Sequence, residues 1–385
     1  MAVVAVKEHR FDESVLHHPN SRASLRELAG HLTRAGFDEY SAAQLLGAPN
    51  PEHLIANPTR YAFFTDATRP APPTAAANVL TSLFILNRPL PSNWVRGALD
   101  PELVDLLRST HLLTLTDDVF RGRVSLTPYR SRYFLSDQLF GNPRPQVLET
   151  HAAADLVMPP HASTLIALDT VAAIEDSFLD VGCGSGFLAL NADREHGRRA
   201  GIDLNPRCVA FASANAELNG EEAVFDVADF ATHTLPATKR YGALLFNAPT
   251  RPVVDSADGE FGQTTGEHVI RTAAAVTPQL LRPDGTAHVL TLIEVPKRFG
   301  TATDIIHHWL ADTTTSEVTV TELENPQFSV TARQMRDRKL HAQSVLVHSA
   351  AQAEQLVRAL EARDVVTVAL VRVSLRPSAK GGPVA

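Results

Sequence analysis

The sequence predicts an α/β protein in which a seven-stranded, doubly wound sheet follows a mainly helical N-terminal domain. From about residue 165 onward, short apolar segments alternate with segments of helical periodicity, a pattern typical of a sheet with helices on both faces. Before that point, three helix-like segments precede a β-ribbon. We therefore expect a loose arm at residues 1–20, an N-terminal domain at 21–145 and the sheet domain at 146–385.

The composition excludes several other classes. Of the 385 residues, 44% are hydrophobic and 20% are charged, so the chain can bury a sizeable core. No apolar run approaches the roughly 20 residues that a membrane span requires. Two cysteines, Cys183 and Cys208, are too few for a disulfide scaffold, and a net charge of -8 argues against general nucleic-acid binding. We expect a cytoplasmic protein without a membrane partner.

The N-terminal domain shows the element order of a winged helix. Residues 24–46 predict short helices interrupted at Gly36, and prolines make 65–73 a loop. Further on, helices are expected at 76–86, 93–99 and 101–107, followed by strands at 112–115 and 123–127 on either side of Asp117 and Asp118.

Winged helices often bind DNA, but the charge pattern here does not favour it. Arginines between residues 76 and 137 are offset by acidic residues, no lysine occurs there, and no basic stripe lies along one helix. A DNA-binding domain should show a concentrated positive surface, because contacts to phosphates supply much of the affinity. We therefore favour a scaffold that forms a homodimer or covers a substrate site.

The sheet domain is predicted element by element. Strands are expected at 177–181, 199–203, 223–226, 242–247 and 287–293, with helices at 206–218 and 267–281. Two more strands, near 317–322 and 365–375, would complete the seven. Capping-box spacing from Ser349 predicts a helix before the last strand.

A glycine loop follows the first of these strands. Gly182, Gly184 and Gly186 have G-x-G-x-G spacing, unlike the G-x-G-x-x-G of dinucleotide-binding proteins. Glycines allow positive backbone dihedrals and close approach to a ligand. Asp203 ends the next strand, where a carboxylate can accept hydrogen bonds from ribose hydroxyls, and Asp229 and Phe230 after the third strand suit an adenine ring.

Residues 165–293 resemble class I S-adenosylmethionine-dependent methyltransferases. The segment from Gly201 to Gly220 is similar to the small-methyltransferase-domain group, which includes release-factor glutamine and ribosomal RNA guanine amino-methyltransferases. The resemblance implies a Rossmann-like sheet and S-adenosylmethionine as cofactor. It places Asp180, Gly182 and Gly184 at the methionine end, Asp203 at the ribose, and Asp229, Phe230 and Leu204 around the adenine. We count Cys183 and Gly186 of the same loop among the cofactor-binding residues, although Cys183 is a small packing residue.

A second motif, Asn247-Ala-Pro-Thr250, ends the fourth strand. Methyl transfer from a sulfonium mainly requires alignment of the acceptor lone pair with the bond that breaks. The Asn247 side-chain oxygen and the Ala248 backbone carbonyl can accept N–H bonds from an amine, and Pro249 keeps Ala248 out of the helical region. Asn247 and Pro249 are therefore the candidate catalytic residues, and Asn247 also borders the cofactor.

Thr250 stands where amino-methylating relatives carry an aromatic residue, so a planar acceptor has no ring on which to stack. We therefore expect a small amine, such as an amino acid or natural-product intermediate. Three alternatives remain open. One is N-methylation of a protein glutamine or an RNA base. Another is a reaction that consumes S-adenosylmethionine by cyclisation or lysis of its aminobutyryl chain. The last is a DNA-binding regulator that senses the cofactor.

Several further residues are candidates from their position in the chain. His161, before the sheet, is a candidate general base, and Tyr129 is a substrate candidate because it ends the N-terminal domain. Asp258 and Glu260 lie in an acidic loop that could contact substrate. The histidine pairs at 17–18 and 307–308 lack the spacing of metal ligands, so no metal is expected.

Overall fold

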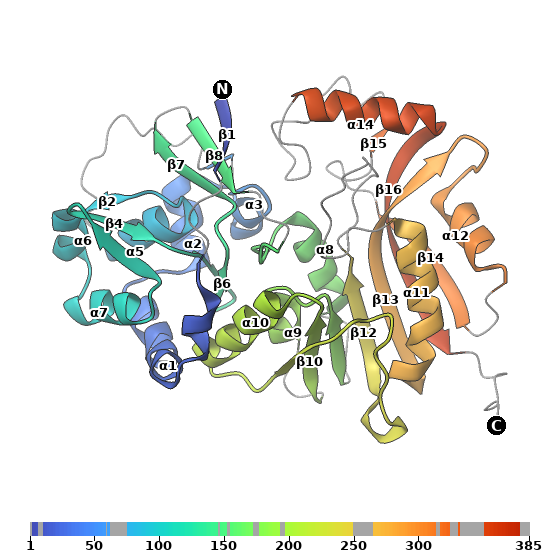
Figure 1. The fold of residues 1–385 in the computed structure, drawn as a ribbon, viewed down its shortest axis with the longest axis horizontal. Coiled ribbons are helices and arrows are strands. Elements are labelled where there is room, and N and C mark those ends of the chain that lie inside the picture. Colours follow the sequence, from blue (N-terminus) through green and yellow to red (C-terminus); the bar gives the residue numbers. More distant parts are fainter. Residues whose placement is uncertain are drawn as a thin grey trace. The chain divides into compact units, whose positions relative to one another are not determined.

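The computed structural model describes residues 2–6, 11–58, 60–61, 75–144, 147–151, 155–171, 177–192, 197–248, 265–312, 316–323, 330–331 and 350–377. Its contacts divide the chain into two compact units (Figure 1). The first unit contains Met1–Ile166, Cys183–Leu190 and Asn205–Phe225; the second contains Ala167–Gly182, Asn191–Leu204 and Asp226–Ala385. The domain boundaries expected from composition, at residues 20 and 145, stay a prediction.

The main sheet contains all seven predicted strands. These are β9 (Phe178–Val181), β10 (Arg199–Asp203), β11 (Val224–Val227), β12 (Tyr241–Asn247), β13 (Leu281–Pro296), β14 (Ser316–Leu323) and β16 (Val365–Pro377). Their order is β11-β10-β9-β12-β13-β16-β14, and a short β15 (Val330–Thr331), which was not predicted, pairs with β16. β9 runs parallel to β10 and β12, whereas β16 is antiparallel to β13 and β14. The α/β fold class is confirmed.

Six helices are described between residues 162 and 362. They are α8 (Ala162–Val171), α9 (Phe187–Asn191), α10 (Pro206–Asn219), α11 (Gly266–Leu280), α12 (Ala302–Leu310) and α14 (Ala350–Ala362). Three of them, α10, α11 and α14, correspond to helices predicted from the sequence. The bounds of α10 follow from its sequence. Asn205 caps the first turn, Pro206 supplies a preset helical φ, and Gly220 ends the helix in the left-handed region at φ 61°. Apolar residues of α11 and α12, including Ile270 and Ile306, pack against Val289 and Val371 of the sheet.

The first unit begins with α1 (Pro19–Arg34), α2 (Glu39–Leu46) and α3 (Pro51–Ala56). Then follow α5 (Ala76–Leu80), the π-helical turn η2 (Thr81–Ile85), β2 (Leu90–Pro91), α6 (Ser92–Ala98), α7 (Pro101–Ser109), β3 (Leu113–Thr116) and β4 (Val119–Gly122). The predicted order of three helical segments and a ribbon is present, with β2 added to the edge of β4. Assignment to the winged-helix class stays a prediction, and the predicted loop at 65–73 lies outside the described residues.

The ribbon itself differs from the prediction. β3 pairs with β4 at 119–122, not with a strand at 123–127. Asp117 and Asp118 both adopt positive φ, 50° and 62°, as a two-residue hairpin turn requires, so the chain returns immediately at Val119. β5 (Ser125–Tyr129) pairs instead with β6 (Arg132–Ser136), and β7 (Phe140–Arg144), β8 (Val147–His151) and β1 (Ala2–Val6) form another sheet.

The expectation of a loose N-terminal arm is wrong for residues 11–18. They contain the 3-10 helix η1 (Glu13–His17), capped by Asp12, and bury Phe11 and Leu16. The Phe11 ring lies edge-on to Phe211 of α10 at 5.8 Å between centroids. The prediction considered the charged residues of this segment. Burial of the two apolar side chains favours the ordered conformation instead. Among the described residues, no helix is long and apolar enough to cross a membrane.

Candidate active site

Three neighbouring strands of the second unit bring their last residues to one edge of the sheet (Figure 1). Ile202 of β10 and Phe246 of β12 are both in register with Val181 of β9. The next residues along each strand are therefore Asp203, Gly182 and Asn247, at the same edge. Ligands of open α/β sheets bind at this carboxyl edge. The structure thus brings together three of the predicted site residues.

Asp180 lies on β9, two positions before Gly182. It is 1% exposed and is in register with Gly201 on one side and Leu245 on the other. Carboxylates are rarely buried in a sheet core unless they are paired or functional. The role at the methionine end of the cofactor that the sequence resemblance implies for Asp180 stays a prediction.

The glycine loop has the predicted backbone. Gly182, Gly184 and Gly186 all have positive φ, at 63°, 54° and 75°, and the Gly186 amide donates to the Cys183 carbonyl at 2.8 Å. In the first unit, a Cβ on Gly186 would lie only 3.0 Å from both the Ala212 Cβ and the Phe225 ring. Glycine is therefore required there by both dihedral and space. Nothing among the described residues lies within 4 Å of a Cβ placed on Gly184, so that position faces open space.

Asp203 and Leu204 follow the loop at the edge of the sheet. Asp203 is half-buried, and its backbone carbonyl accepts from the Ala228 amide at 3.0 Å, which holds the end of β10. Leu204 is 48% exposed, an apolar side chain directly after a carboxylate. This pairing suits a ligand with hydroxyls and a flat apolar ring.

Asp229 and Phe230 differ in burial and in their contacts. The Phe230 ring is buried and packs edge-on against Phe246, with 5.3 Å between centroids. Asp229 is exposed, and its carboxylate accepts the Ala231 amide at 2.9 Å, so it closes a local turn. The predicted contact of these residues with an adenine ring stays a prediction.

Asn247 is the last residue of β12 and is half-buried. The Ala248 amide donates to the Leu290 carbonyl of β13 at 3.0 Å, so sheet pairing continues one residue beyond the strand. This bond fixes the backbone that carries both candidate amine acceptors. Pro249 and Thr250 lie outside the described residues, as do Asp258 and Glu260.

Both ring nitrogens of His161 have partners at the start of α8, and its role as a general base stays a prediction. Its Nδ1 lies 3.1 Å from the Pro159 carbonyl and 3.3 Å from the Thr164 hydroxyl, and its Nε2 lies 3.0 Å from the Ser163 hydroxyl. Burial lowers the pKa of His161, so the ring is neutral at pH 7. With both nitrogens engaged at the start of α8, the side chain stabilises the first turn of that helix.

Tyr129 is buried within the first unit. Its ring lies 5.4 Å from that of Phe187, the first residue after Gly186, and burial raises its pKa. The sequence argument placed Tyr129 near the site from chain position alone. In the structure, the Tyr129 ring contacts the first residue of α9, the helix that follows the glycine loop. Cys183 is buried and is not in a disulfide. The described residues contain no group of three or more candidate metal ligands.

One residue that the sequence argument did not identify holds the glycine loop. Asn215 of α10 is fully buried and donates to the Ser185 carbonyl, between two of the loop glycines, at 2.8 Å. The same side chain exchanges hydrogen bonds with the amide and carbonyl of Leu135, at 2.7 and 2.9 Å. The available signal was an asparagine in mid-helix, where this residue type is unfavourable, with Asn219 four residues later on the same face.

Comparison with known proteins agrees with this geometry. A protein-family model for ribosomal protein L11 methyltransferase (PrmA) matches residues 160–254. The resemblance to S-adenosylmethionine-dependent methyltransferases is confirmed for residues 160–254. The matched segment contains the glycine loop, Asp203 and Asn247.

Individual relatives match the same part of the chain. The ribosomal protein L11 methyltransferase of Dechloromonas aromatica is 36% identical over 114 residues, which is 26% of this chain and 37% of that protein. A protein of Methanocaldococcus jannaschii, provisionally named a protein N5-glutamine methyltransferase, is 23% identical over 140 residues, or 34% of this chain and 70% of that protein. This chain thus spans little more than a third of the first relative.

Solved structures resemble the chain only weakly. The crystal structure of geranyl diphosphate C-methyltransferase from Streptomyces coelicolor A3(2) is 16% identical, covers 56% of this chain and 78% of that chain, and has a TM-score of 0.37. Similarity at this level supports no inference about the acceptor.

Proposed function

We propose that this chain is an S-adenosylmethionine-dependent methyltransferase that acts on a nitrogen atom. The observation that carries the proposal is the strand register that sets Asp203 and Asn247 beside the first loop glycine at one sheet edge. The family match of residues 160–254 supports the same activity.

The residues present fit that cofactor. Gly184 faces open space at a positive φ, so the loop backbone can approach a ligand that a Cβ would keep away. The Asp203 carboxylate would accept the two ribose hydroxyls, Asp180 and Gly182 would line the methionine end, and Leu204 would cover the adenine. S-adenosylmethionine, when bound, supplies a methyl group on a positively charged sulfur.

Asn247 and Ala248 would orient the acceptor. Their carbonyl oxygens can accept two N–H bonds from an amine, which directs its remaining lone pair toward the methyl carbon. The same oxygens stabilise the positive charge that develops on nitrogen during transfer. The bond from Ala248 to Leu290 keeps this backbone in place, so little reorganisation is needed when the acceptor binds.

For the acceptor, we propose a small amine, such as an amino acid or natural-product intermediate. Thr250 offers no ring for a planar amide or base to stack on. The net charge of -8 argues against a nucleic-acid partner. A homodimer through the N-terminal domain and a cytoplasmic location complete this proposal.

A protein acceptor is the second candidate. The relatives from Dechloromonas aromatica and Methanocaldococcus jannaschii carry names that specify a ribosomal protein and a protein glutamine. A third candidate consumes S-adenosylmethionine without methyl transfer, by attack within its aminobutyryl chain, because the same fold can serve either reaction.

One experiment separates the three. The full chain is incubated with S-adenosylmethionine and either a set of amino acids or a ribosomal protein extract, and the products are identified by mass. S-adenosylhomocysteine that forms only with the amino acids supports the proposal, whereas formation only with the extract favours a protein acceptor. Methylthioadenosine would indicate the third reaction. If calorimetry detects no binding of S-adenosylmethionine or S-adenosylhomocysteine, the proposal fails.

A further inference from the structure

The two faces of the main sheet in the second unit carry different side chains. One face belongs to the apolar core that α11 and α12 share, and Val289 and Val373 point into it. Their neighbours along each strand point to the opposite face, because side chains alternate in a strand. Strand pairing places four residues of that opposite face side by side at the end of β12, in what we call the edge row: Asn247, Leu290, Arg372 and Thr321.

Further rows of the same face lie behind the edge row. His288 is paired with Ser374, whose hydroxyl lies 3.0 Å from the His288 Nδ1. In the row behind these, Arg376 donates from Nε to the Thr286 hydroxyl at 3.1 Å. The face therefore carries two arginines of β16, Arg372 and Arg376, which lie about 13 Å apart along the strand.

Arg372 has no acidic partner in the described part of the chain. Its half-buried guanidinium donates one long hydrogen bond of 3.4 Å to the Thr170 hydroxyl of α8, which belongs to the same unit. Its neighbours in the edge row, Leu290 and Thr321, are both uncharged. A guanidinium has five N–H donors in a planar fork, so most of them are left for a ligand. A planar carboxylate matches that fork with two parallel bonds.

The other basic residues of this face differ from Arg372. Arg376 lies directly opposite Glu317 of β14, so it has an acidic neighbour. Burial and the two arginines lower the pKa of His288 to about 4, which leaves its ring neutral at pH 7. Of the three, Arg372 is thus the residue whose positive charge has no neighbouring acid in its own row.

Arg372 shares the edge row with Asn247, the candidate residue for orienting the acceptor amine. The two residues are two strands apart, which corresponds to about 10 Å between their Cα atoms. A hydrogen bond of about 3 Å at each end leaves room for a small molecule whose two polar groups lie a few bonds apart. Leu290, between them, is apolar and offers no competing polar side chain.

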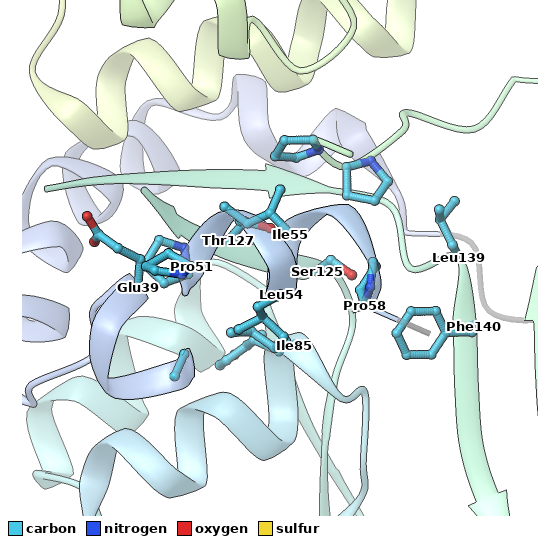
Figure 2. Close-up of a pocket in the computed structure, with 15 residues that line it drawn as sticks. Glu39, Pro51, Leu54, Ile55, Pro58, Ile85, Ser125, Thr127, Leu139 and Phe140 are labelled. Atoms are coloured by element: carbon cyan, nitrogen blue, oxygen red, sulfur yellow. The ribbon is translucent and has the colours of Figure 1, made fainter. Parts of the chain in front are cut away.

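A carboxylate would find no such partner in the small cavity of the first unit (Figure 2). This cavity of about 40 Å³ has mainly apolar walls, and Glu39 is the single ionisable residue among the described residues that line it. An acid would repel a bound carboxylate, and burial without a partner would disfavour it further. All of these lining residues belong to the first unit, whereas Asn247 and Arg372 belong to the second.

We propose that Arg372 binds the carboxylate of the methyl acceptor while Asn247 holds its amine, so that the acceptor is a free amino acid. This inference rests on the proposed function and narrows its substrate class from small amines to amino acids. Arg372 would determine specificity, because an amine without a carboxylate leaves the guanidinium unpaired.

The test compares each of the twenty amino acids with its carboxamide, which keeps the amine and the side chain but lacks the negative charge. The full chain is titrated in the presence of S-adenosylhomocysteine, and binding is followed by ligand-observed NMR. We expect at least one amino acid to bind about tenfold or more tightly than its carboxamide, as a charge-assisted pair of hydrogen bonds predicts.

Arg372→Gln should remove this preference, so that acid and carboxamide bind equally. Arg372→Lys should recover part of it, because lysine restores the charge without the planar fork. The Kd of S-adenosylmethionine, measured by calorimetry, should stay as in the wild type for both variants. If Arg372→Gln does not fold, the partial loss of preference in Arg372→Lys carries the test.

Arg376→Gln is the matched control, because Arg376 lies on the same strand and face and also bonds a threonine hydroxyl. It should keep the full preference for the acid. A preference that survives Arg372→Gln, or that Arg376→Gln reduces equally, would overturn the inference. A purely structural role of Arg372 would lower stability in urea without changing the ratio of the two affinities. Weaker S-adenosylmethionine binding by Arg372→Gln would assign the residue to the cofactor instead.

Failure of this inference can be told apart from failure of the proposed function. Calorimetry with S-adenosylmethionine tests the cofactor site independently of the amino acids. Normal cofactor binding without binding of any amino acid removes only the carboxylate site and favours a protein acceptor. Preference for the acid without cofactor binding removes the methyltransferase proposal and leaves Arg372 as a carboxylate site for another purpose.

Discussion

The Asn215 side chain donates a hydrogen bond of 2.8 Å to the backbone carbonyl of Ser185, so a residue in the middle of α10 holds the centre of the glycine loop. Ser185 lies between Gly184 and Gly186, both of which have positive φ. Asn215 also bridges to Leu135 of β6, and α10, β6 and this part of the loop are thereby connected through one amide.

Asn215→Ala should weaken S-adenosylmethionine binding at least tenfold and lower the free energy of unfolding by about 2–4 kcal/mol, since it leaves buried backbone groups without partners. Asn219→Ala is the control. The Asn219 side chain forms hydrogen bonds of 2.8 Å with the Tyr133 amide and carbonyl, and the variant removes these without removing the bond to Ser185. Calorimetry and urea unfolding measure the two effects. Equal loss of cofactor affinity in both variants would contradict the positioning role of Asn215.

Gly186→Ala should destabilise the protein by about 2–3 kcal/mol and abolish cofactor binding. The new Cβ would be strained at φ 75° and would lie 3.0 Å from Ala212 and Phe225. Gly36→Ala has nearly the same φ, 67°, but open space around the Cβ, so only the backbone strain of about 1 kcal/mol applies. Urea titration of both variants would show no difference if crowding at Gly186 were unimportant.

Asp203→Ala and Asn247→Ala should have opposite effects. Loss of the Asp203 carboxylate should weaken S-adenosylmethionine binding by about tenfold to a hundredfold with less effect on turnover of the saturated enzyme. Loss of the Asn247 amide should slow turnover by about a hundredfold and leave the cofactor Kd nearly unchanged. Calorimetry and product mass measure the two quantities. Equal effects of both variants on S-adenosylmethionine binding would contradict the assignment of Asp203 to the cofactor and of Asn247 to the acceptor.

Arg207→Met should destabilise the first unit by about 3–5 kcal/mol. The buried guanidinium donates to both Asp137 carboxylate oxygens at 2.7 Å and also contacts Glu13, so the variant leaves the buried Asp137 carboxylate without this cation. Arg207→Met combined with Asp137→Leu should recover part of the loss, because both charges are then removed.

Arg26 provides the exposed comparison for that ion pair. Its guanidinium bonds Glu217 of the same helix α10 at 2.7 Å, but the Arg26 side chain is 64% exposed. Solvent screens such pairs, so Arg26→Met should leave the urea midpoint nearly unchanged. A double variant of Arg207 and Asp137 that is no more stable than Arg207→Met alone would show that the charge balance is not what stabilises this contact.

His288 should make stability fall at acidic pH. Its burial, together with the nearby Arg372 and Arg376, lowers the pKa of His288 from 6.5 to about 4 in the folded protein. The unfolded chain then binds a proton that the folded chain does not, so stability is lost as pH falls from about 6.5 to 4, by roughly 3 kcal/mol in all.

His288→Gln should remove that part of the pH dependence, and it can still pair with Ser374, whose hydroxyl lies 3.0 Å from the His288 Nδ1. Urea unfolding at pH 7 and pH 4.5 compares the variant with the wild type. Identical losses between the two pH values in both proteins would mean that other groups carry the acid sensitivity.

The amino-acid sequence determined the order of the main elements and the chemistry of the sheet edge. The alternation of apolar segments predicted all seven strands, although β13 begins at Leu281, well before the predicted start at 287, and three glycines predicted the dihedrals seen at 182, 184 and 186. These features are local, because each depends on side-chain alternation or on the absence of a Cβ within a short segment.

Contacts between distant segments were decided only by the tertiary structure. The Arg207–Asp137 pair joins residues 70 positions apart, and Asn215 reaches Leu135 across 80 positions, so no window of sequence reveals either one. The ordered segment at 11–18 has the same origin, since Phe11 packs against Phe211, 200 positions away in the chain. Burial and pairing of this kind arise only when the chain has folded, which is why charge counting predicted a loose arm.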